Sequence, residues 1–278
     1  MRNLSAAYNQ HMHGGDQGVV KEEIIHNRCT ECGEVTHYGF CRECNAPADP
    51  IWFCSDCKKE HSEKPEECSS CGGERFQRYK ETDIDVKSMM DDALENLGMN
   101  KPPELLKSFR GMTSKHKHVE PIEKGLLREK YDLYVNKDAT VRYDALDIPI
   151  THFKPREISA PVEKLRELGY THDVEGNKLE RDDQVVALKP QDIVIPESEK
   201  TLPASDYFVN VANFVDELLE EFYNLEPYYN AESKEDLIGS LVIGLAPHTS
   251  GGTVGRIIGF TNAKGMYAHP YWHAAKRR

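Results

Sequence analysis

The chain has 278 residues, which is enough for one sizeable hydrophobic core or two small domains. Hydrophobic residues make up 38% of it and charged residues 29%, as is typical of a soluble protein, and no apolar run approaches the roughly 20 residues of a membrane span. The first residues, MRNLSAAYNQHMHGG, lack an apolar signal core. We therefore expect a cytoplasmic protein without a membrane partner.

The net charge of -12 would argue against nucleic acid as a partner if it were spread evenly along the chain. The charge is uneven, however. Residues 197–236 carry 11 acidic side chains and two lysines, whereas residues 107–130 carry seven Lys or Arg and three Glu. An acidic total can therefore hide basic surfaces that face DNA.

Residues 1–26 are expected to be a lead-in segment, in which residues 1–17 are poorly ordered and residues 18–25 form a strand. Residues 27–80 hold all eight cysteines, arranged as four CxxC pairs. Each CxxC turn directs two thiolates at one point, and two turns complete a tetrahedral site with Zn–S distances of ~2.3 Å. The sequence therefore predicts a module with two structural Zn²⁺ ions, one held by Cys29, Cys32, Cys41 and Cys44 and the other by Cys54, Cys57, Cys68 and Cys71.

The spacing of the CxxC pairs does not decide which pairs share an ion, so an interleaved arrangement stays open. A four-thiolate site has no open position for a substrate, which favours a structural role. An intracellular setting disfavours disulfides, and the absence of a βαβ pattern disfavours a redox role. His37 and His61 lie between the pairs and could replace a ligand, although four thiolates per site suffice. Gly33 and Gly72 follow pairs at points where the turn requires an open backbone.

Residues 81–196 are predicted to be a mixed α/β region. Apolar residues at helical spacing predict a helix over residues 84–97 and a second, shorter helix around residues 105–109. The run YDLYVNKDATVRYDA (131–145) predicts a hairpin, residues 161–168 predict a short helix, and LKPQDIVIP (188–196) predicts a strand that ends in proline.

Four cations in this region are candidate contacts to DNA phosphate. Lys115 and Lys117 lie two residues apart, which in a strand would place both on one face, and a solvated loop is the alternative. Lys154 and Arg156 flank Pro155, whose fixed backbone angle favours an extended path that presents both cations together.

Residues 197–240 are predicted to be an acidic helical segment. The clearest helix of the chain covers residues 206–223, with an apolar stripe and a polar face that carries Asp216, Glu217, Glu220 and Glu221. This acidic run could be a metal site, but a solvated surface is the simpler interpretation. Ser233 and Asp236, three residues apart, resemble a capping box that opens a last short helix.

Residues 241–278 alternate glycines with apolar β-branched runs, which suits the strands of a small barrel whose backbone passes close to something else. The final residues change character, because His269, Trp272 and His273 lead into three consecutive cations, Lys276, Arg277 and Arg278, of the kind that meets phosphate. The two histidines could equally be packed beside the tryptophan.

Several enzyme signatures are absent from the sequence. It contains no GxxxxGK[ST], GxSxG or HExxH motif. His248, Thr249 and Ser250 place a hydroxyl near an imidazole, but neighbours in sequence rarely form a nucleophile pair. Because the glycine-rich region has no closely spaced carboxylate pair either, we expect no catalytic residue in this chain.

Two stretches, APHTSGGTVGRIIGFT (246–261) and YAHPYWHAAKRR (267–278), resemble the large subunit of the archaeal family D DNA polymerase. The resemblance covers residues 18–278 and includes the cysteine pairs, ELLKSFRGMTSK (104–115), THFKPREI (151–158), KLRELGYTHD (164–173), LKPQDIVIP and LEPYYN (225–230). In that family the last stretch leads into Asn-Cys-Asp-Gly-Asp, whose aspartates hold the catalytic metals. We therefore expect a fragment, from a split gene, an intein-linked break or an incomplete record.

The resemblance implies an α+β fold in which residues 241–278 form part of a double-psi β-barrel polymerase core. It also implies template-directed nucleotidyl transfer with Mg²⁺ in the complete polymerase, with a DNA primer-template and dNTP as substrates. A small proofreading exonuclease subunit and a sliding clamp are the implied protein partners. On this interpretation the fragment alone is inactive, and its contacts to DNA or triphosphate near the missing aspartates are Arg256, His269, His273, Lys276, Arg277 and Arg278.

The alternative function is a noncatalytic zinc-ribbon scaffold that binds nucleic acid or a partner protein. This alternative explains the cysteine pairs and the missing carboxylates. It explains the terminal cations and the glycine-rich strands poorly.

Overall fold

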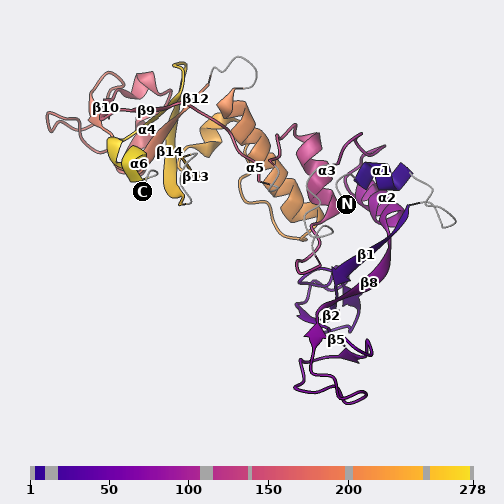
Figure 1. The fold of residues 1–278 in the computed structure, drawn as a ribbon. Coiled ribbons are helices and arrows are strands. Elements are labelled where there is room, and N and C mark those ends of the chain that lie inside the picture. Colours follow the sequence, from indigo (N-terminus) through magenta and orange to yellow (C-terminus); the bar gives the residue numbers. More distant parts are fainter. Residues whose placement is uncertain are drawn as a thin grey trace. The chain divides into compact units, whose positions relative to one another are not determined.

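The computed structural model describes residues 4–9, 18–106, 115–136, 140–197, 203–246 and 251–275, and Figure 1 labels many of their elements. The chain divides into two compact units, Met1–Arg142 with Asp216–Pro227, and Tyr143–Val215 with Tyr228–Arg278. It therefore passes from one unit to the other three times. The five segments expected from the sequence remain a prediction that this division does not test.

The first unit begins with helix α1 (Leu4–Asn9), which contacts helix α2 (Val86–Asn96) and strand β1 (Val19–Ile25). Leu4 is fully buried, and the Tyr8 hydroxyl donates to Asp91 at 2.7 Å. The expectation of poor order is therefore wrong for residues 4–9, because their apolar and hydroxyl groups find partners far along the chain. The strand expected at residues 18–25 is confirmed.

Strand β1 pairs antiparallel with β8 (Tyr79–Asp85), from Val19↔Asp85 to Ile25↔Tyr79, so the two strands bracket the cysteine region. Helix α2 follows β8 directly, and its N-cap residue Asp85 accepts a hydrogen bond from the Ser88 N–H. The helix predicted over residues 84–97 is thus confirmed, and it buries one face through Val86, Met90, Ala93 and Leu94.

The cysteine region folds into two small antiparallel sheets of three strands each. The first sheet has the order β3 (Val35–Thr36), β2 (Asn27–Cys29), β4 (Ala48–Pro50), and the second has the order β6 (Glu60–His61), β5 (Trp52–Cys54), β7 (Phe76–Gln77). In each sheet the central strand ends at the first cysteine of a CxxC pair. We call these two sheets with their cysteines the first ribbon (residues 27–50) and the second ribbon (residues 52–77).

Two predictions in the rest of the first unit are covered only in part by the described residues. The short helix expected around residues 105–109 is absent from residues 101–106, and residues 107–114 lie outside the described part. The hairpin expected over residues 131–145 is shorter than predicted, because Tyr131 and Asp132 form the turn that ends helix α3 (Ile122–Lys130); among its described residues a single bridge, Val135↔Val141, joins the two arms.

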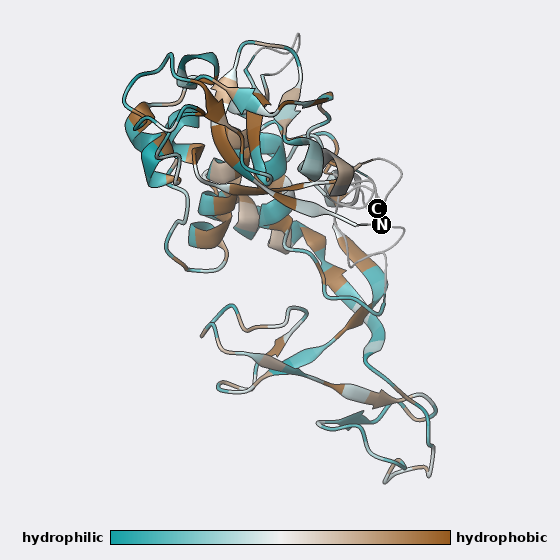
Figure 2. Cartoon of the chain, turned by 90° about the vertical axis from the view of Figure 1, so that its left-hand side faces the viewer, coloured by the Kyte–Doolittle hydropathy of each residue, from teal (hydrophilic) through white to brown (hydrophobic). Residues whose placement is uncertain are grey.

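The second unit is built on a mixed sheet of five strands in the order β13 (Leu241–Gly244), β14 (Thr253–Thr261), β12 (Asp192–Pro196), β15 (Met266–Ala268), β9 (Asp147–Pro149). Strand β14 runs parallel to β12 and antiparallel to β13, and β15 runs antiparallel to β12 and parallel to β9. Figure 2 shows hydrophobic residues concentrated on strands of this sheet. The strand predicted at residues 188–196 is confirmed as β12, whose residues are all buried.

Shorter elements surround this sheet. Strands β10 (His152–Phe153) and β11 (Val186–Ala187) pair with each other, and helix α4 (Val162–Glu167) confirms the helix predicted at residues 161–168. The 3-10 helix η1 covers Pro155–Glu157, and helix α6 covers Pro270–Ala275. The 3-10 helix η2 (Lys234–Leu237) begins as predicted, because the Asp236 carboxylate accepts from the N–H and the hydroxyl of Ser233 at 2.9 and 3.1 Å.

Helix α5 (Ala204–Glu221) confirms the long helix predicted at residues 206–223. Its polar face is not wholly solvated, however, because Asp216 is only 7% exposed. Glu217 accepts from the Tyr131 hydroxyl at 2.6 Å and forms an ion pair with Lys130. The expectation of a solvated face is therefore wrong at Asp216, which is buried, and at Glu217, whose carboxylate meets partners from α3 and the residue after it. No helix in the described ranges is long and apolar enough to cross a membrane.

Candidate metal centres and nucleic-acid contacts

The eight cysteine sulfurs gather into two sets of four, one in each ribbon. The Sγ atoms of Cys29, Cys32, Cys41 and Cys44 lie within 4.8 Å of one another, and so do those of Cys54, Cys57, Cys68 and Cys71. The ligand sets are thus sequential, and the interleaved arrangement is not the one found.

The separations between sulfurs fit a tetrahedral metal ion. Four sulfurs bound at ~2.3 Å to a zinc ion lie about 3.8 Å apart. In the first ribbon Cys29–Cys44, Cys32–Cys41 and Cys32–Cys44 are 3.4, 3.6 and 3.8 Å apart, and in the second ribbon Cys54–Cys71 and Cys57–Cys68 are 3.5 and 3.6 Å apart. These separations are too long for disulfides, so both sets are compatible with zinc.

Backbone conformation brings each cysteine pair together. The residue that follows each pair has a positive φ, 76° at Gly33, 57° at Asn45, 63° at Lys58 and 71° at Gly72. The open backbone expected at the two glycines is confirmed, and Asn45 and Lys58 adopt the same conformation without glycine's freedom. In the first cysteine pair, the N–H groups of Cys32 and Glu31 each donate to Cys29 Sγ at 3.4 Å.

These N–H groups favour the thiolate form that binds metal. The bond from the Cys32 N–H, with a smaller contribution from Glu31, lowers the pKa of the Cys29 thiol to about 6. In the second ribbon the Ser70 N–H is the main cause that lowers the pKa of the Cys68 thiol to about 6. Each set therefore has a sulfur that is mostly thiolate, the form that binds a metal ion, at neutral pH.

Neither spare histidine is placed as one of the four ligands. His37 Nδ1 lies 3.0 Å from the carbonyl oxygen of Ile25, and the imidazole is turned to the backbone there. His61 Nε2 lies 3.6 Å from Cys68 Sγ, which is the position of an outer hydrogen-bond partner of a ligand.

The two candidate DNA contacts in the first unit, Lys115 and Lys117, differ in whether they form an ion pair. Residues 115–120 form turns and irregular backbone, so the loop alternative holds and Lys115 and Lys117 do not share a strand face. Lys115 Nζ pairs with Glu23 at 3.1 Å and lies 4.5 Å from the centre of the Tyr79 ring. Lys117 is exposed, and it has no ion pair with another described residue.

Lys154 and Arg156 lie at the start of η1 in the second unit, so the extended path expected at Pro155 is wrong beyond Lys154, where the chain turns into a 3-10 helix. The Glu157 carboxylate accepts from the Lys154 N–H at 2.9 Å, and the Arg156 N–H donates to the carbonyl oxygen of Asp182 at 3.1 Å. Their backbones are thus fixed, while neither cationic group makes an ion pair with another described residue. Arg156 is exposed and Lys154 half-buried, so both can present charge to a ligand.

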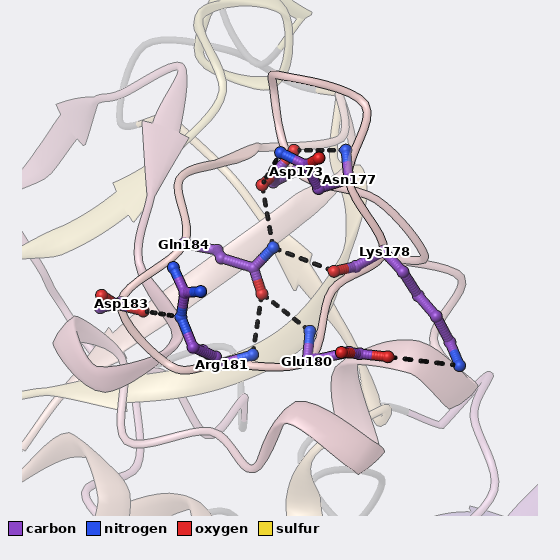
Figure 3. A network of polar contacts seen from close by, with 7 residues as sticks. All are labelled: Asp173, Asn177, Lys178, Glu180, Arg181, Asp183 and Gln184. Atoms are coloured by element: carbon purple, nitrogen blue, oxygen red, sulfur yellow. Dashed lines mark hydrogen bonds and ion pairs between the residues drawn. The ribbon is translucent and has the colours of Figure 1, made fainter.

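The loop that fixes Arg156 is organised around the buried side-chain amide of Gln184 (Figure 3). Its Oε1 accepts from the N–H groups of Glu180 and Arg181 at 2.8 Å, and its Nε2 donates to Asp173 and to the Lys178 carbonyl oxygen at 2.8 and 2.9 Å. All of the amide's hydrogen-bonding groups are used. The sequence alone did not indicate this residue, because a lone glutamine in a polar loop carries no pattern.

Arg256 makes internal contacts. Its guanidinium donates to both Asp192 oxygens, at 2.9 and 2.7 Å, and to the Leu168 carbonyl oxygen at 3.2 Å. Asp192 is 2% exposed and also accepts from the Tyr170 hydroxyl at 2.5 Å. Burial and this hydrogen bond raise the pKa of Tyr170.

The DNA contact expected of Arg256 stays a prediction, and the contacts seen hold β14, β12 and the end of α4 together. An aspartate inside the apolar run LKPQDIVIP was the signal that reasoning from sequence missed.

The C-terminal candidates flank a buried tryptophan in the sequence. Trp272 is 2% exposed, and its indole N–H donates to the Val254 carbonyl oxygen at 3.0 Å. His269 Nδ1 accepts from the Tyr271 N–H at 3.1 Å, and the two rings stack with centres 5.8 Å apart. His273 lies in α6, and Lys276, Arg277 and Arg278 lie outside the described residues. The contacts expected of these residues remain predictions.

Comparison with known proteins identifies the family. Residues 98–278 match the family described as the DNA polymerase II large subunit DP2, catalytic domain. The DNA polymerase II large subunit of Archaeoglobus fulgidus is 46% identical over 276 residues, which are 99% of this chain and 23% of the relative. The subunit of Pyrococcus abyssi is 50% identical over 272 residues, which are 95% of this chain and 18% of the relative. For Thermococcus kodakarensis the identity is 49% over 268 residues, 94% of this chain and 14% of the relative.

The chain thus spans less than a quarter of the length of each of these relatives. The match nevertheless includes the whole second unit and part of the first. This chain belongs to the family of the DNA polymerase II large subunit DP2.

Proposed function

We propose that this chain is a fragment of the DNA-synthesising large subunit of an archaeal replicative DNA polymerase. The observation that carries the proposal is the match of residues 98–278 to the catalytic domain of that subunit. On this proposal the substrates of the complete enzyme are a DNA primer-template and dNTP, and a small exonuclease subunit and a sliding clamp are its partners in the cytoplasm. The scaffold alternative has no comparable support.

Two kinds of metal belong to this proposal. The two cysteine sets would each hold a structural Zn²⁺, which fixes the fold of its ribbon. In the complete polymerase, Mg²⁺ would activate the primer 3′-hydroxyl and stabilise the leaving pyrophosphate. We assign the aspartates that hold it to a part of the relatives that this chain does not match. We also assign the five-stranded sheet of the second unit to a double-psi β-barrel core, which its mixed parallel and antiparallel pairing supports.

The cations of this chain would attract and align the DNA backbone. Lys117, Lys154 and Arg156 suit this role best, because none has an ion pair with another described residue and each can approach phosphate without losing an internal partner. Lys115, His269, His273 and the three terminal cations would add further contacts. Arg256 would also support the site by fixing Asp192 and the end of α4, and its contact with DNA or triphosphate stays part of the proposal. Contacts of this kind bind DNA of any sequence.

The salt dependence of DNA binding tests this assignment. Each phosphate contact contributes roughly one unit to the slope of log affinity against log salt concentration. Replacing Lys117, Lys154 and Arg156 together by Gln should therefore lower the slope by about two to three units. The measurement is fluorescence anisotropy of a labelled primer-template at several salt concentrations. Lys21→Gln is the matched control, because Lys21 lies 4.0 Å from Glu81 and from Asp83 and should change the slope little.

An unchanged slope in the triple variant would contradict the assignment of these three residues. The same mixture, supplied with Mg²⁺ and dNTP, tests the fragment itself. We expect binding without primer extension, because the metal-holding aspartates lie outside this chain. Primer extension that depends on this chain would place an active site within it, and would overturn the assignment of the metal-holding aspartates to another part of the polymerase.

A further inference from the structure

The first ribbon carries an arginine inside one of its metal-binding turns. Arg42 lies between the ligands Cys41 and Cys44, and its Nη2 is 2.8 Å from Oε1 of Glu123 on helix α3. The Glu123 side chain is 1% exposed, and its Oε1 makes this ion pair but no hydrogen bond. A buried carboxylate depends strongly on its partner, because an unpaired charge away from water is unfavourable.

The same guanidinium covers an aromatic ring from the end of helix α5. Its central carbon lies 5.0 Å from the centre of the Phe222 ring, a distance at which the cation is attracted by the ring face. Phe222 is itself 3% exposed. Arg42 therefore lies between a buried carboxylate and a buried aromatic ring, and both contacts depend on where the turn holds its backbone.

Other residues of the first ribbon pack on the same part of the chain. We call residues 216–227 the helix-end segment, and they belong to the first unit. Tyr38 and Phe40 meet Phe222 edge-on with ring centres 5.5 and 5.4 Å apart, and Phe40 also lies 5.5 Å from Tyr223. Asn45, just after the ligand Cys44, donates to the Tyr223 carbonyl oxygen at 3.3 Å. The contacts thus come from residues 38–45, the part of the ribbon that contains its second cysteine pair.

The second ribbon has the same strand arrangement but a different surface. Its corresponding pair is Cys68-Ser69-Ser70-Cys71, so the position of Arg42 is taken by Ser69, whose hydroxyl accepts from Lys59 of the same ribbon at 3.2 Å. Ser69 and Ser70 are both exposed. The two metal sites are therefore alike in their ligands and unlike in what surrounds them.

We propose that metal occupancy of the first site is thermodynamically linked to the docking of the helix-end segment, through Arg42, and that the second site lacks this link. A bound ion fixes the backbone of the Cys41–Cys44 turn, and that turn sets the position of the guanidinium. Loss of the ion frees the turn and removes the contact of Arg42 with both Glu123 and Phe222. Linkage is reciprocal, so a docked segment also strengthens metal binding at the first site by the same factor.

Hydrogen exchange and cysteine alkylation of the full chain test the two directions of this linkage. Arg42→Gln retains all eight cysteines and should retain two zincs by elemental analysis. We expect it to raise amide exchange in residues 216–227 about fivefold or more, within the usual range of coupling between sites. During competition with a chelator, Cys44 should become alkylated faster by a similar factor while Cys71 keeps its rate. Ser69→Ala is the matched control and should change neither quantity.

Ligand variants complete the test. Cys44→Ser should release the helix-end segment, whereas Cys71→Ser, at the corresponding position of the second ribbon, should leave its exchange unchanged. Equal release by both variants would overturn the specific link to the first site. If Cys44→Ser misfolds, Arg42→Gln decides alone, and unchanged exchange together with unchanged Cys44 alkylation in that variant would overturn the proposal.

Discussion

His26 is a buried histidine at the junction of the first ribbon and the β1–β8 pair. It is 4% exposed, and its Nε2 is 2.8 Å from the Thr82 hydroxyl. Burial, followed by the neighbouring positive groups His37 and Lys80, lowers its pKa to about 4, and Glu60 opposes this shift. The folded protein therefore holds this imidazole neutral at a pH where an exposed histidine is protonated.

Stability should consequently fall on acidification, with His26 as one contributor. An exposed histidine has a pKa of about 6.5, so between about pH 6.5 and pH 4 the unfolded chain binds a proton that the folded chain does not. Across that window the folded state should lose up to about 3 kcal/mol through this group. His26→Phe should flatten the dependence of the unfolding free energy on pH in this window, measured by denaturant titration with zinc present. His172→Phe, at an exposed position, should leave the slope as it is, and an equal slope in both variants would contradict the assignment.

The packing of strand β14 depends on two glycines, which have no Cβ atom. It lies inside the sheet between β13 and β12, and Ile257, Ile258 and Phe260 are all buried. A Cβ at Gly259 would lie 2.3 Å from the carbonyl oxygen of Ile158, which accepts from the Phe260 N–H at 2.7 Å. A Cβ at Gly255 would lie 3.0 Å from the indole of Trp272. The expectation that the glycine-rich backbone passes close to something is thus confirmed at both positions.

Gly259→Ala should destabilise the second unit. The added methyl group meets backbone that cannot rotate away, so strand and loop must separate, and overpacking of this kind costs about 1–3 kcal/mol. Gly251→Ala is the matched control, because a Cβ there meets no heavy atom of the described residues within 4 Å. Thermal unfolding should show a lower midpoint for the first variant only. A Gly259→Ala protein as stable as the control would mean that the close approach is relieved at little cost.

The two units differ in what stabilises them. The core of the second unit is an apolar cluster that includes Leu165, Ile193, Ile257, Phe260 and Trp272. The ribbons of the first unit are small sheets whose strands have two or three residues, so their order should depend on bound metal. The chain contains only two tryptophans, Trp52 in the second ribbon and Trp272 in the second unit, and each can therefore report on one unit.

Removal of zinc should affect the two tryptophans differently. In a Trp272→Phe variant, a chelator should shift the Trp52 emission towards that of an exposed indole, because metal binding supplies much of the folding free energy of such a ribbon, about 10–16 kcal/mol in isolated zinc peptides. In a Trp52→Phe variant the emission of buried Trp272 should stay unchanged. Readdition of zinc should reverse the first change. Equal responses from both tryptophans would show that the second unit also depends on metal.

The sequence by itself determined the features that depend on local spacing. Four CxxC pairs indicated the eight cysteines as ligands, and apolar periodicity located the helices at residues 84–97, 161–168 and 206–223. Glycines in residues 241–278 indicated that the backbone there passes close to other atoms. These features could be predicted because a turn, a helix face or a missing Cβ is set by residues that are neighbours along the chain.

Tertiary structure decided the features that join distant residues. Pairing of the cysteine sets, burial of Asp216, the contact of Arg42 with Glu123 and Phe222, and the commitment of Arg256 to Asp192 all link residues that periodicity does not relate. A charged side chain looks the same in sequence whether it faces water or a buried partner. Which of the two it meets depends on whether the attraction of the buried partner outweighs the free energy of removing the charge from water, and only the folded chain brings that partner within reach.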